Sequence, residues 1–152
     1  MATKAADLYE VDFYAWTQQQ AEVIRSLRGD NRLDVDHLAE EIEDLGSSRL
    51  NACQSYLAQI IAHLLKLDYS GLELPRRLWR AEVVAFRQNL RRKMSPTIRK
   101  RLEDGFDEIY RDAVALASTS LEAEPDLEDR LPKNNPYTLD EILTRDPFEG
   151  AG

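Results

Sequence analysis

Apolar residues recur along most of the chain at the spacing of amphipathic helices. At 100° per residue they gather on one side of a helix in four successive segments. The segments cover residues 7–28, 35–69, 75–93 and about 95–121. Ser95 followed by Pro96 is a strong helix start, because a hydroxyl caps the first turn and proline fits the first helical position. No segment alternates like a β-strand, so the pattern predicts an all-α fold with four longer helices.

The rest of the chain predicts a loop and a short final helix. Residues 122–136 contain three prolines and five acidic residues, which favours an irregular acidic loop over residues 122–137. Thr138 and Glu141 have capping-box spacing, which predicts a helix that ends near residue 145. We expect one domain over residues 1–152, an antiparallel bundle of four longer helices plus a short C-terminal helix.

The predicted helix over residues 35–69 has two unusual features. Gly46 lies inside it, but the apolar stripe stays in phase on both sides, so we expect a continuous helix that another helix approaches closely. Over residues 56–67 the helix is apolar nearly all round, which indicates burial on more than one side. We favour a central helix in a monomer. The alternative is a two-fold homodimer. Its interface would contain Leu57, Ile61 and Leu65.

Composition narrows the class of protein. The 152 residues are 43% hydrophobic and 32% charged, which excludes collagen-like and wholly disordered chains. The single Cys53 excludes an intrachain disulfide framework and a CxxC zinc ribbon. The longest uncharged run, residues 50–65, is too short and too polar to span a bilayer, and no N-terminal signal segment is visible. We therefore expect an acidic, cytoplasmic protein without membrane contact.

Charge is distributed unevenly along the chain. The formal net charge is −8, yet residues 76–101 contain ten Lys or Arg and one acidic residue. Six of these cations bracket the turn at Ser95 and could hold a phosphate group, aided by the backbone amides at the start of the next helix. These candidate anion-binding residues are Arg91, Arg92, Lys93, Arg99, Lys100 and Arg101.

Two interpretations of this basic segment remain open. In the first, which we favour, the basic helices face acidic helices of the same chain. In the second, the basic hairpin over residues 87–101 binds a polyanion, as in a nucleic-acid-associated or antitoxin-like protein. No aromatic residues alternate with the cations, and 28 acidic residues outnumber 20 basic ones, so we expect no tight binding of nucleic acid.

One candidate pocket centres on His63, which lies on the apolar stripe of its helix. Polar residues flank that stripe and the stripe of the next helix, which predicts a small polar cluster inside the bundle. Its candidate residues are Glu41, His63, Lys66, Trp79, Glu82 and Arg87. We favour a core histidine satisfied by one hydrogen bond. The alternative is a small-molecule pocket, or an enzyme that uses His63 as a general base with Glu41 or Lys66.

The sequence gives little support for metal or nucleophilic chemistry. His37 and Glu41 are four residues apart and could both ligate a cation, but a site needs more ligands, and the Glu-x-x-His pairs of di-iron bundles are absent. The sequence offers no nucleophile, general base and anion hole that would come together in one active site. We expect no metal, no cofactor, and a protein-interaction or small-ligand-binding module; an enzyme is the alternative.

Several specific motifs occur in a fixed order from about residue 8 to residue 148. They are Leu8-Tyr9, Asp12 to Trp16, Leu38 to Gly46, His63 to Lys66, Trp79, Arg87, Ser95-Pro96, Asn135 to Leu139 and Ile142-Leu143. Together these motifs resemble the bacterial family known as domain of unknown function 29, which is frequent in cyanobacteria. At one place the chain departs from the family, with Asn135-Pro136-Tyr137 where Cys-Pro-Trp is usual. The resemblance implies an all-helical fold and no particular activity.

Overall fold

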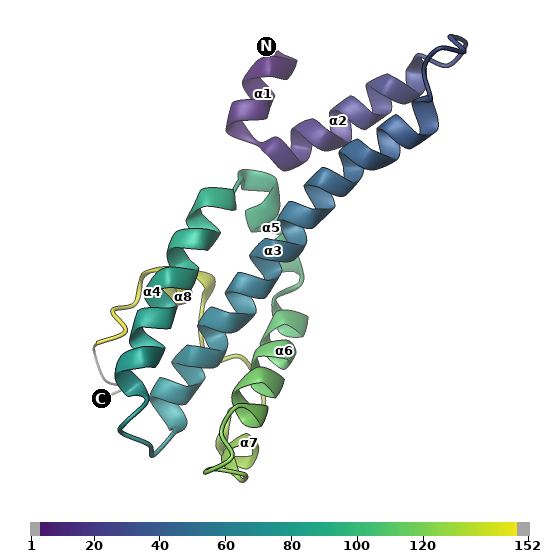
Figure 1. Cartoon of the computed structure of the whole chain (residues 1–152). Helices are drawn as coiled ribbons and strands as arrows, with labels where there is room; N and C mark the ends of the chain where they lie inside the picture. Colours follow the sequence, from purple (N-terminus) through teal and green to yellow (C-terminus); the bar gives the residue numbers. More distant parts are fainter. Residues whose placement is uncertain (1–3, 149–152) are drawn as a thin grey trace. The chain divides into compact units, whose positions relative to one another are not determined.

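The structure is a computed structural model that describes residues 4–148. Within this range it contains eight helices and no strand, which confirms the predicted all-α fold (Figure 1). The helices are α1 (Ala5–Val11), α2 (Phe13–Ser26), α3 (Val35–Tyr69), α4 (Arg76–Lys93), α5 (Pro96–Asp104), α6 (Phe106–Thr119), α7 (Leu127–Arg130) and α8 (Leu139–Thr144). None of the helices in residues 4–148 combines the length and the apolar character needed to cross a membrane.

Two of the predicted helices are interrupted. The first ends at Asp12, whose Oδ1 accepts a hydrogen bond from the Ala15 amide at 3.0 Å and so caps the start of α2. The fourth is divided by Gly105, which has φ −98° and ψ 15° and leaves α5 and α6 as separate helices. The predicted loop over residues 122–137 contains the short helix α7. The other predicted boundaries agree closely, and α3 runs without interruption over residues 35–69.

Contacts between residues divide the chain into two compact units, and α3 passes through both. Unit 1 consists of residues 1–53 and 93–101, and unit 2 consists of residues 54–92 and 102–152. The single domain expected from the sequence remains a prediction.

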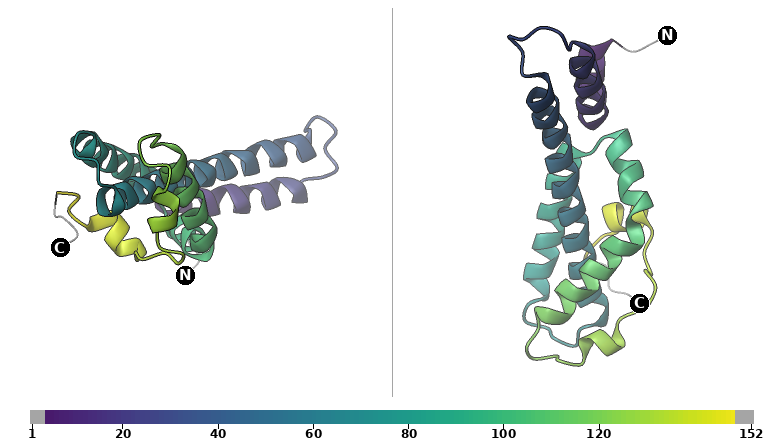
Figure 2. Two further views of the ribbon diagram at one scale, coloured as in Figure 1. Left: turned by 90° about the horizontal axis from the view of Figure 1, so that it is seen from below. Right: turned by 90° about the vertical axis from the view of Figure 1, so that its right-hand side faces the viewer.

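In unit 1, α2 and the first half of α3 form an antiparallel hairpin (Figures 1 and 2). Small buried residues line the contact between the two helices, with Thr17 and Ala21 on α2 and Ala39 and Gly46 on α3. A Cβ atom at Gly46 would lie 2.2 Å from Thr17 Oγ1, so only glycine fits there. This confirms the close approach of a second helix that the sequence predicted at Gly46.

In unit 2, the second half of α3 supplies much of the core. Its fully buried side chains belong to the core of this unit together with buried apolar residues of α4, α6 and α8, such as Val83, Ile109 and Ile142. Figures 1 and 2 show α4 and α6 running beside this half of α3. Leu57, Ile61 and Leu65 have no exposed surface within a single chain, as expected of the central helix that we favoured. The oligomeric state itself remains a prediction.

Candidate functional site

Large apolar side chains on one side of the α2–α3 hairpin lie at or near the surface. Leu27, directly after the end of α2, is 52% exposed, and Leu38 and Leu45 on α3 are 42% and 56% exposed. We call this surface the hairpin face. It consists of Phe13, Trp16, Ile24, Leu27, Leu38, Ile42 and Leu45.

The apolar stripe of α3 includes Leu38, Ile42 and Leu45, and the structure leaves this part of the stripe at or near the surface. On α3 that stripe lies about 70° round the helix from Ala39 and Gly46, which make the contact with α2. Small residues at the contact bring the helices close together and leave the larger side chains on its flank. Periodicity identified the apolar stripe correctly but could not show which side of the helix meets its neighbour.

An aromatic cluster extends the hairpin face at the start of α2. The ring centroids of Tyr9, Phe13 and Trp16 lie 4.9–5.6 Å apart. The Arg49 guanidinium carbon lies 4.1 Å from the centre of the Phe13 ring, so a cation from α3 covers the aromatic side of α2. This contact also shows that the α2 and α3 parts of the face lie on the same side of the hairpin.

The electrostatics of the hairpin differ between its two flanks. On the flank opposite the hairpin face, Arg25 on α2 and Glu43 on α3 form an ion pair at 2.5 Å. On α3, residues 36–45 include five acidic residues and no Lys or Arg. Glu41 is exposed beside the Leu38 stripe. It belongs to unit 1, and the other residues predicted for the pocket belong to unit 2.

His63 has the environment expected of a core histidine. It is 9% exposed, and its Nδ1 donates a hydrogen bond to the Gln59 carbonyl oxygen at 2.7 Å. Burial lowers the pKa of His63, and the positive charge of Lys66 lowers it further. The neutral imidazole is therefore favoured at pH 7. The Phe86 ring centroid lies 5.7 Å from that of the imidazole.

The predicted neighbours of His63 come together only in part. Lys66 is buried with its Nζ 5.2 Å from the centre of the Trp79 ring. Burial lowers the pKa of Lys66, and the charge of Glu82 opposes that shift. Glu82 also acts electrostatically on His63, so these four residues form one group.

Arg87, also predicted for the pocket, instead holds the end of α8. Its Nε donates to the Ile142 carbonyl and its Nη1 to the Arg145 carbonyl, both at 2.7 Å, and its Nη2 lies 3.5 Å from the Glu141 carbonyl. The last carbonyl groups of a helix have no partners within the helix, so a cation stabilises them well. The guanidinium therefore has a structural role that explains its burial.

A carboxylate of the chain itself contacts the start of α5, where the sequence predicted a phosphate site. Oδ2 of Asp12 accepts a hydrogen bond from the Thr97 amide, in the first turn of α5, at 2.9 Å. Burial raises the pKa of Asp12, but hydrogen bonds from Ala15 and Thr97 outweigh it and hold the pKa below its usual value. Ser95 Oγ caps the same helix by accepting a hydrogen bond from the Ile98 amide at 3.3 Å, as predicted.

The six candidate anion-binding residues are divided between the two units. Arg91 and Arg92 belong to unit 2, while Lys93 and residues 99–101 belong to unit 1. Arg101 lies over the Tyr14 ring, with its guanidinium carbon 5.8 Å from the ring centre. The phosphate site at this turn remains a prediction.

A buried carboxylate that sequence reasoning missed lies in unit 2. Glu124 accepts hydrogen bonds from the Ser70 hydroxyl, from the Gly71 amide at 3.1 Å and from Arg130 Nη2 at 2.6 Å. These interactions outweigh the effect of burial and lower the pKa of Glu124 to about 2. No sequence signal marks it, because Ser70 and Gly71 are more than fifty residues away.

A second buried group was also missed. Asp68 forms a two-pronged ion pair with Arg145, at 2.7 and 2.8 Å, and accepts a hydrogen bond from the Tyr137 hydroxyl at 2.6 Å. Burial and the neighbouring carboxylate raise the pKa of Tyr137. Tyr137 belongs to the closing motif quoted above, which was the only sequence signal for this group. Together, these contacts anchor the C-terminal segment to α3.

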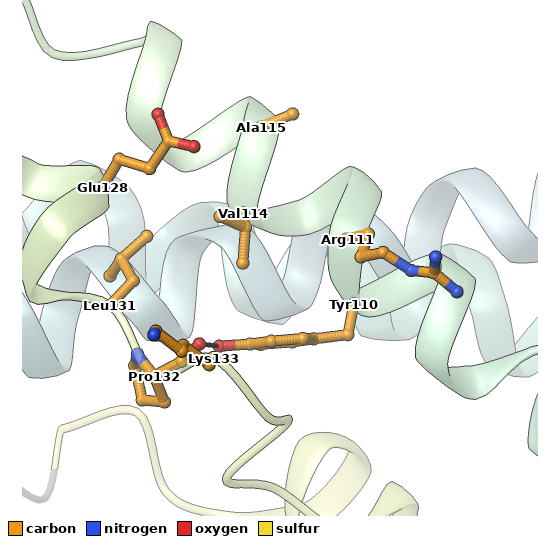
Figure 3. A pocket seen from close by; sticks show the side chains of 8 residues that line it. All are labelled: Tyr110, Arg111, Val114, Ala115, Glu128, Leu131, Pro132 and Lys133. Atoms are coloured by element: carbon orange, nitrogen blue, oxygen red, sulfur yellow. Dashed lines mark hydrogen bonds between the residues drawn. The ribbon is translucent and has the colours of Figure 1, made fainter.

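A pocket of about 300 Å³ opens between α6 and the segment that contains α7 (Figure 3). Its lining residues are Tyr110, Arg111, Val114, Ala115, Glu128, Leu131, Pro132 and Lys133. The Tyr110 hydroxyl donates a hydrogen bond to the Pro132 carbonyl and ties the helix to the loop. Within residues 4–148, no group of three or more His, Cys, Asp or Glu residues could hold a metal ion.

Comparisons with known proteins agree with the motifs quoted above. A family model described as "Domain of unknown function DUF29" matches residues 8–148. The chain is also similar to an alpha-helical protein of unknown function from Rhodospirillum rubrum, known from a crystal structure. The TM-score is 0.74 and the sequence identity 28%, and the match covers 96% of this chain and 92% of that one. No functionally curated protein matches.

Proposed function

We propose that this chain, which belongs to the family described as Domain of unknown function DUF29, is a protein-interaction module. Its binding surface is the hairpin face. The partner is an amphipathic helix of another protein, with basic residues along one side. The observation that carries this proposal is the exposure of Leu27, Leu38 and Leu45 on one side of a helical hairpin.

Exposed apolar residues are concentrated in the hairpin region. Twelve large apolar side chains of the described residues are exposed, and seven of them lie between residues 9 and 45. Single exposed leucines are common on proteins, but a contiguous apolar patch usually marks an interaction site. Full burial of a leucine contributes about 1.5–3 kcal/mol, so covering three half-exposed leucines would contribute about 3 kcal/mol.

The geometry of the face suits a helix as its occupant. Two packed helices present apolar residues along their common flank, and a third helix can pack against both at once. Such a partner contributes apolar residues at i, i+3, i+4 and i+7, the pattern by which amphipathic helices bind apolar surfaces. The Tyr9–Phe13–Trp16 cluster supplies the aromatic side chains that often dominate the energy of such contacts.

Charge distinguishes between a foreign partner and a second copy. The α3 side of the face borders the acidic segment 36–45, which includes the exposed Glu41 and no Lys or Arg. A partner with Lys or Arg along that side gains attraction and faster association. A second copy that faced this border with its own α3 would bring like charges together, which is unfavourable. The acidic border therefore supports a basic helix over self-association.

The test uses a synthetic amphipathic helix as the probe. We would measure binding of a peptide of about 18 residues, built from Leu and Lys at helical spacing, by fluorescence anisotropy. A matched peptide with Glu in place of Lys serves as the charge control. We expect micromolar binding of the Leu–Lys peptide and at least about tenfold weaker binding of the Leu–Glu peptide.

Two variants separate an apolar docking site from simple charge attraction. Leu45→Asp removes an exposed apolar side chain of the face and adds a negative charge. If apolar contact provides the affinity, this variant should bind the Leu–Lys peptide at least about tenfold more weakly. Leu78→Asp makes the same change at a 61% exposed position on α4 in unit 2, and should leave binding unchanged. Tighter or equal binding by Leu45→Asp would refute the proposal. A micromolar dimer in sedimentation that Leu45→Asp dissociates would also overturn it, in favour of a second copy.

A further inference from the structure

We propose that the pocket between α6 and the segment after α7 binds a small carboxylic acid with a short apolar chain. The pocket lies wholly in unit 2, whereas the hairpin face lies in unit 1. The two proposals therefore rest on different residues, and either can fail without the other.

One part of the site is apolar. Val114, Leu131, Pro132 and the Tyr110 ring surround it, as Figure 3 shows. The hydrogen bond from the Tyr110 hydroxyl to the Pro132 carbonyl fixes the ring as one wall. The volume of about 300 Å³ is at the lower end of the range for ligand pockets, which suits a small molecule. An alkyl chain placed there would replace water on apolar side chains.

The other part of the site offers hydrogen-bond donors. A second pocket, of about 250 Å³, shares Tyr110, Arg111 and Lys133 with the first and adds Asn135 to its lining. The Asn135 Oδ1 accepts a hydrogen bond from the Tyr137 amide at 3.0 Å, which fixes the orientation of the side-chain amide. Its Nδ2 is buried and has no partner among the described residues. That nitrogen has almost no accessible surface, so the donors open to a ligand in the two pockets are those of Arg111 and Lys133.

The charges explain why a carboxylate fits better than a polyanion. Arg111 and Lys133 are positive, but Asp107 and Glu128 also line the two pockets and bring the formal charge to zero. Long-range attraction therefore does not select the ligand, and a highly charged phosphate gains little. A single carboxylate can accept a hydrogen bond from the exposed Lys133 ammonium while its chain occupies the apolar part.

The test uses hexanoate as the probe and hexanamide, its neutral analogue, as the control. We would record ¹H–¹⁵N spectra of the full chain at increasing concentrations of each. Hexanoate should produce saturable shifts at the amides of Tyr110, Arg111, Val114 and Lys133, and hexanamide should bind at least about tenfold more weakly.

Three variants complete the experiment. Ala115→Trp adds a large side chain at an exposed position of the pocket wall and should abolish the shifts while the helical circular dichroism is kept. Lys133→Ala removes one exposed hydrogen-bond donor and should weaken the binding of hexanoate about tenfold. Arg77→Ala removes a positive charge at an exposed position of α4 in the same unit and should leave the binding of hexanoate unchanged. The proposal is wrong if hexanoate gives no saturable shifts, if hexanamide binds equally well, or if Ala115→Trp leaves binding intact.

Discussion

Replacing Glu124 by glutamine tests how much one buried carboxylate stabilises unit 2. The folded protein lowers the pKa of Glu124 from 4.5 to about 2 through Ser70 and Arg130. A carboxylate with a lower pKa in the folded state stabilises the fold fully above pH 4.5. That stabilisation is lost as the pH falls from about 4.5 towards 2. Glu124→Gln keeps the size of the side chain and removes its charge.

The magnitude follows from the pKa and from the exposure of the partner. A shift of this size corresponds to about 3 kcal/mol at neutral pH. The Arg130 side chain is 39% exposed, and solvent screens its part of the interaction. We therefore expect Glu124→Gln to lower the free energy of unfolding by about 2 kcal/mol at pH 7. For a chain of this length, that is a fall in Tm of about 4–8 °C.

Urea denaturation at several pH values measures this effect. The difference between the wild-type protein and Glu124→Gln should be largest at pH 7 and shrink by about 1.4 kcal/mol per pH unit below about pH 4. Glu128→Gln, at an exposed position on α7, serves as the control and should change stability by less than about 0.5 kcal/mol. A Glu124→Gln difference that is small at pH 7, or that does not depend on pH, would refute the reasoning.

Two further substitutions test packing and hydrogen bonding by the same denaturation assay. Gly46→Ala places a Cβ atom against Thr17 and should destabilise the protein by about 1–3 kcal/mol, whereas Gly71→Ala meets only an ordinary 3.8 Å contact and serves as its control. If Gly46→Ala left the free energy of unfolding unchanged, the two helices could move apart without any loss of stability, which would contradict this prediction. Arg87→Met leaves carbonyl groups at the end of α8 without donors and should cost about 2–4 kcal/mol, with little effect from Arg77→Met at an exposed site on the same helix. Equal effects of the two methionine variants would contradict the structural role of Arg87.

Local signals in the sequence were sufficient to predict most of the helices. The limits of α3 follow from apolar periodicity, which depends only on the geometry of the helix itself. Thr138 and Ser95 were predicted as caps, and their side chains accept hydrogen bonds from Glu141 and Ile98. These features involve residues three or four apart, so the sequence contains everything needed to predict them.

Contacts between distant residues decided the rest. Asp12 interrupts the first predicted helix and also accepts a hydrogen bond from Thr97, 85 residues away. Local spacing cannot show such a contact. The sequence likewise could not show that Arg87 donates hydrogen bonds to carbonyl groups at the end of α8, because helical angles predict the face of a residue but not its neighbour on another helix.

The candidate sites show the same division between local pattern and tertiary contact. The sequence by itself determined that Leu38, Ile42 and Leu45 share one side of α3 and that acidic residues surround them. Only the tertiary structure decided that this side lies at the surface, because Ala39 and Gly46 bring α2 against the neighbouring side and leave no room for larger residues. The pocket at Tyr110 and Lys133 likewise exists only because a loop folds back on α6, an arrangement set by hydrogen bonds between residues far apart in the chain.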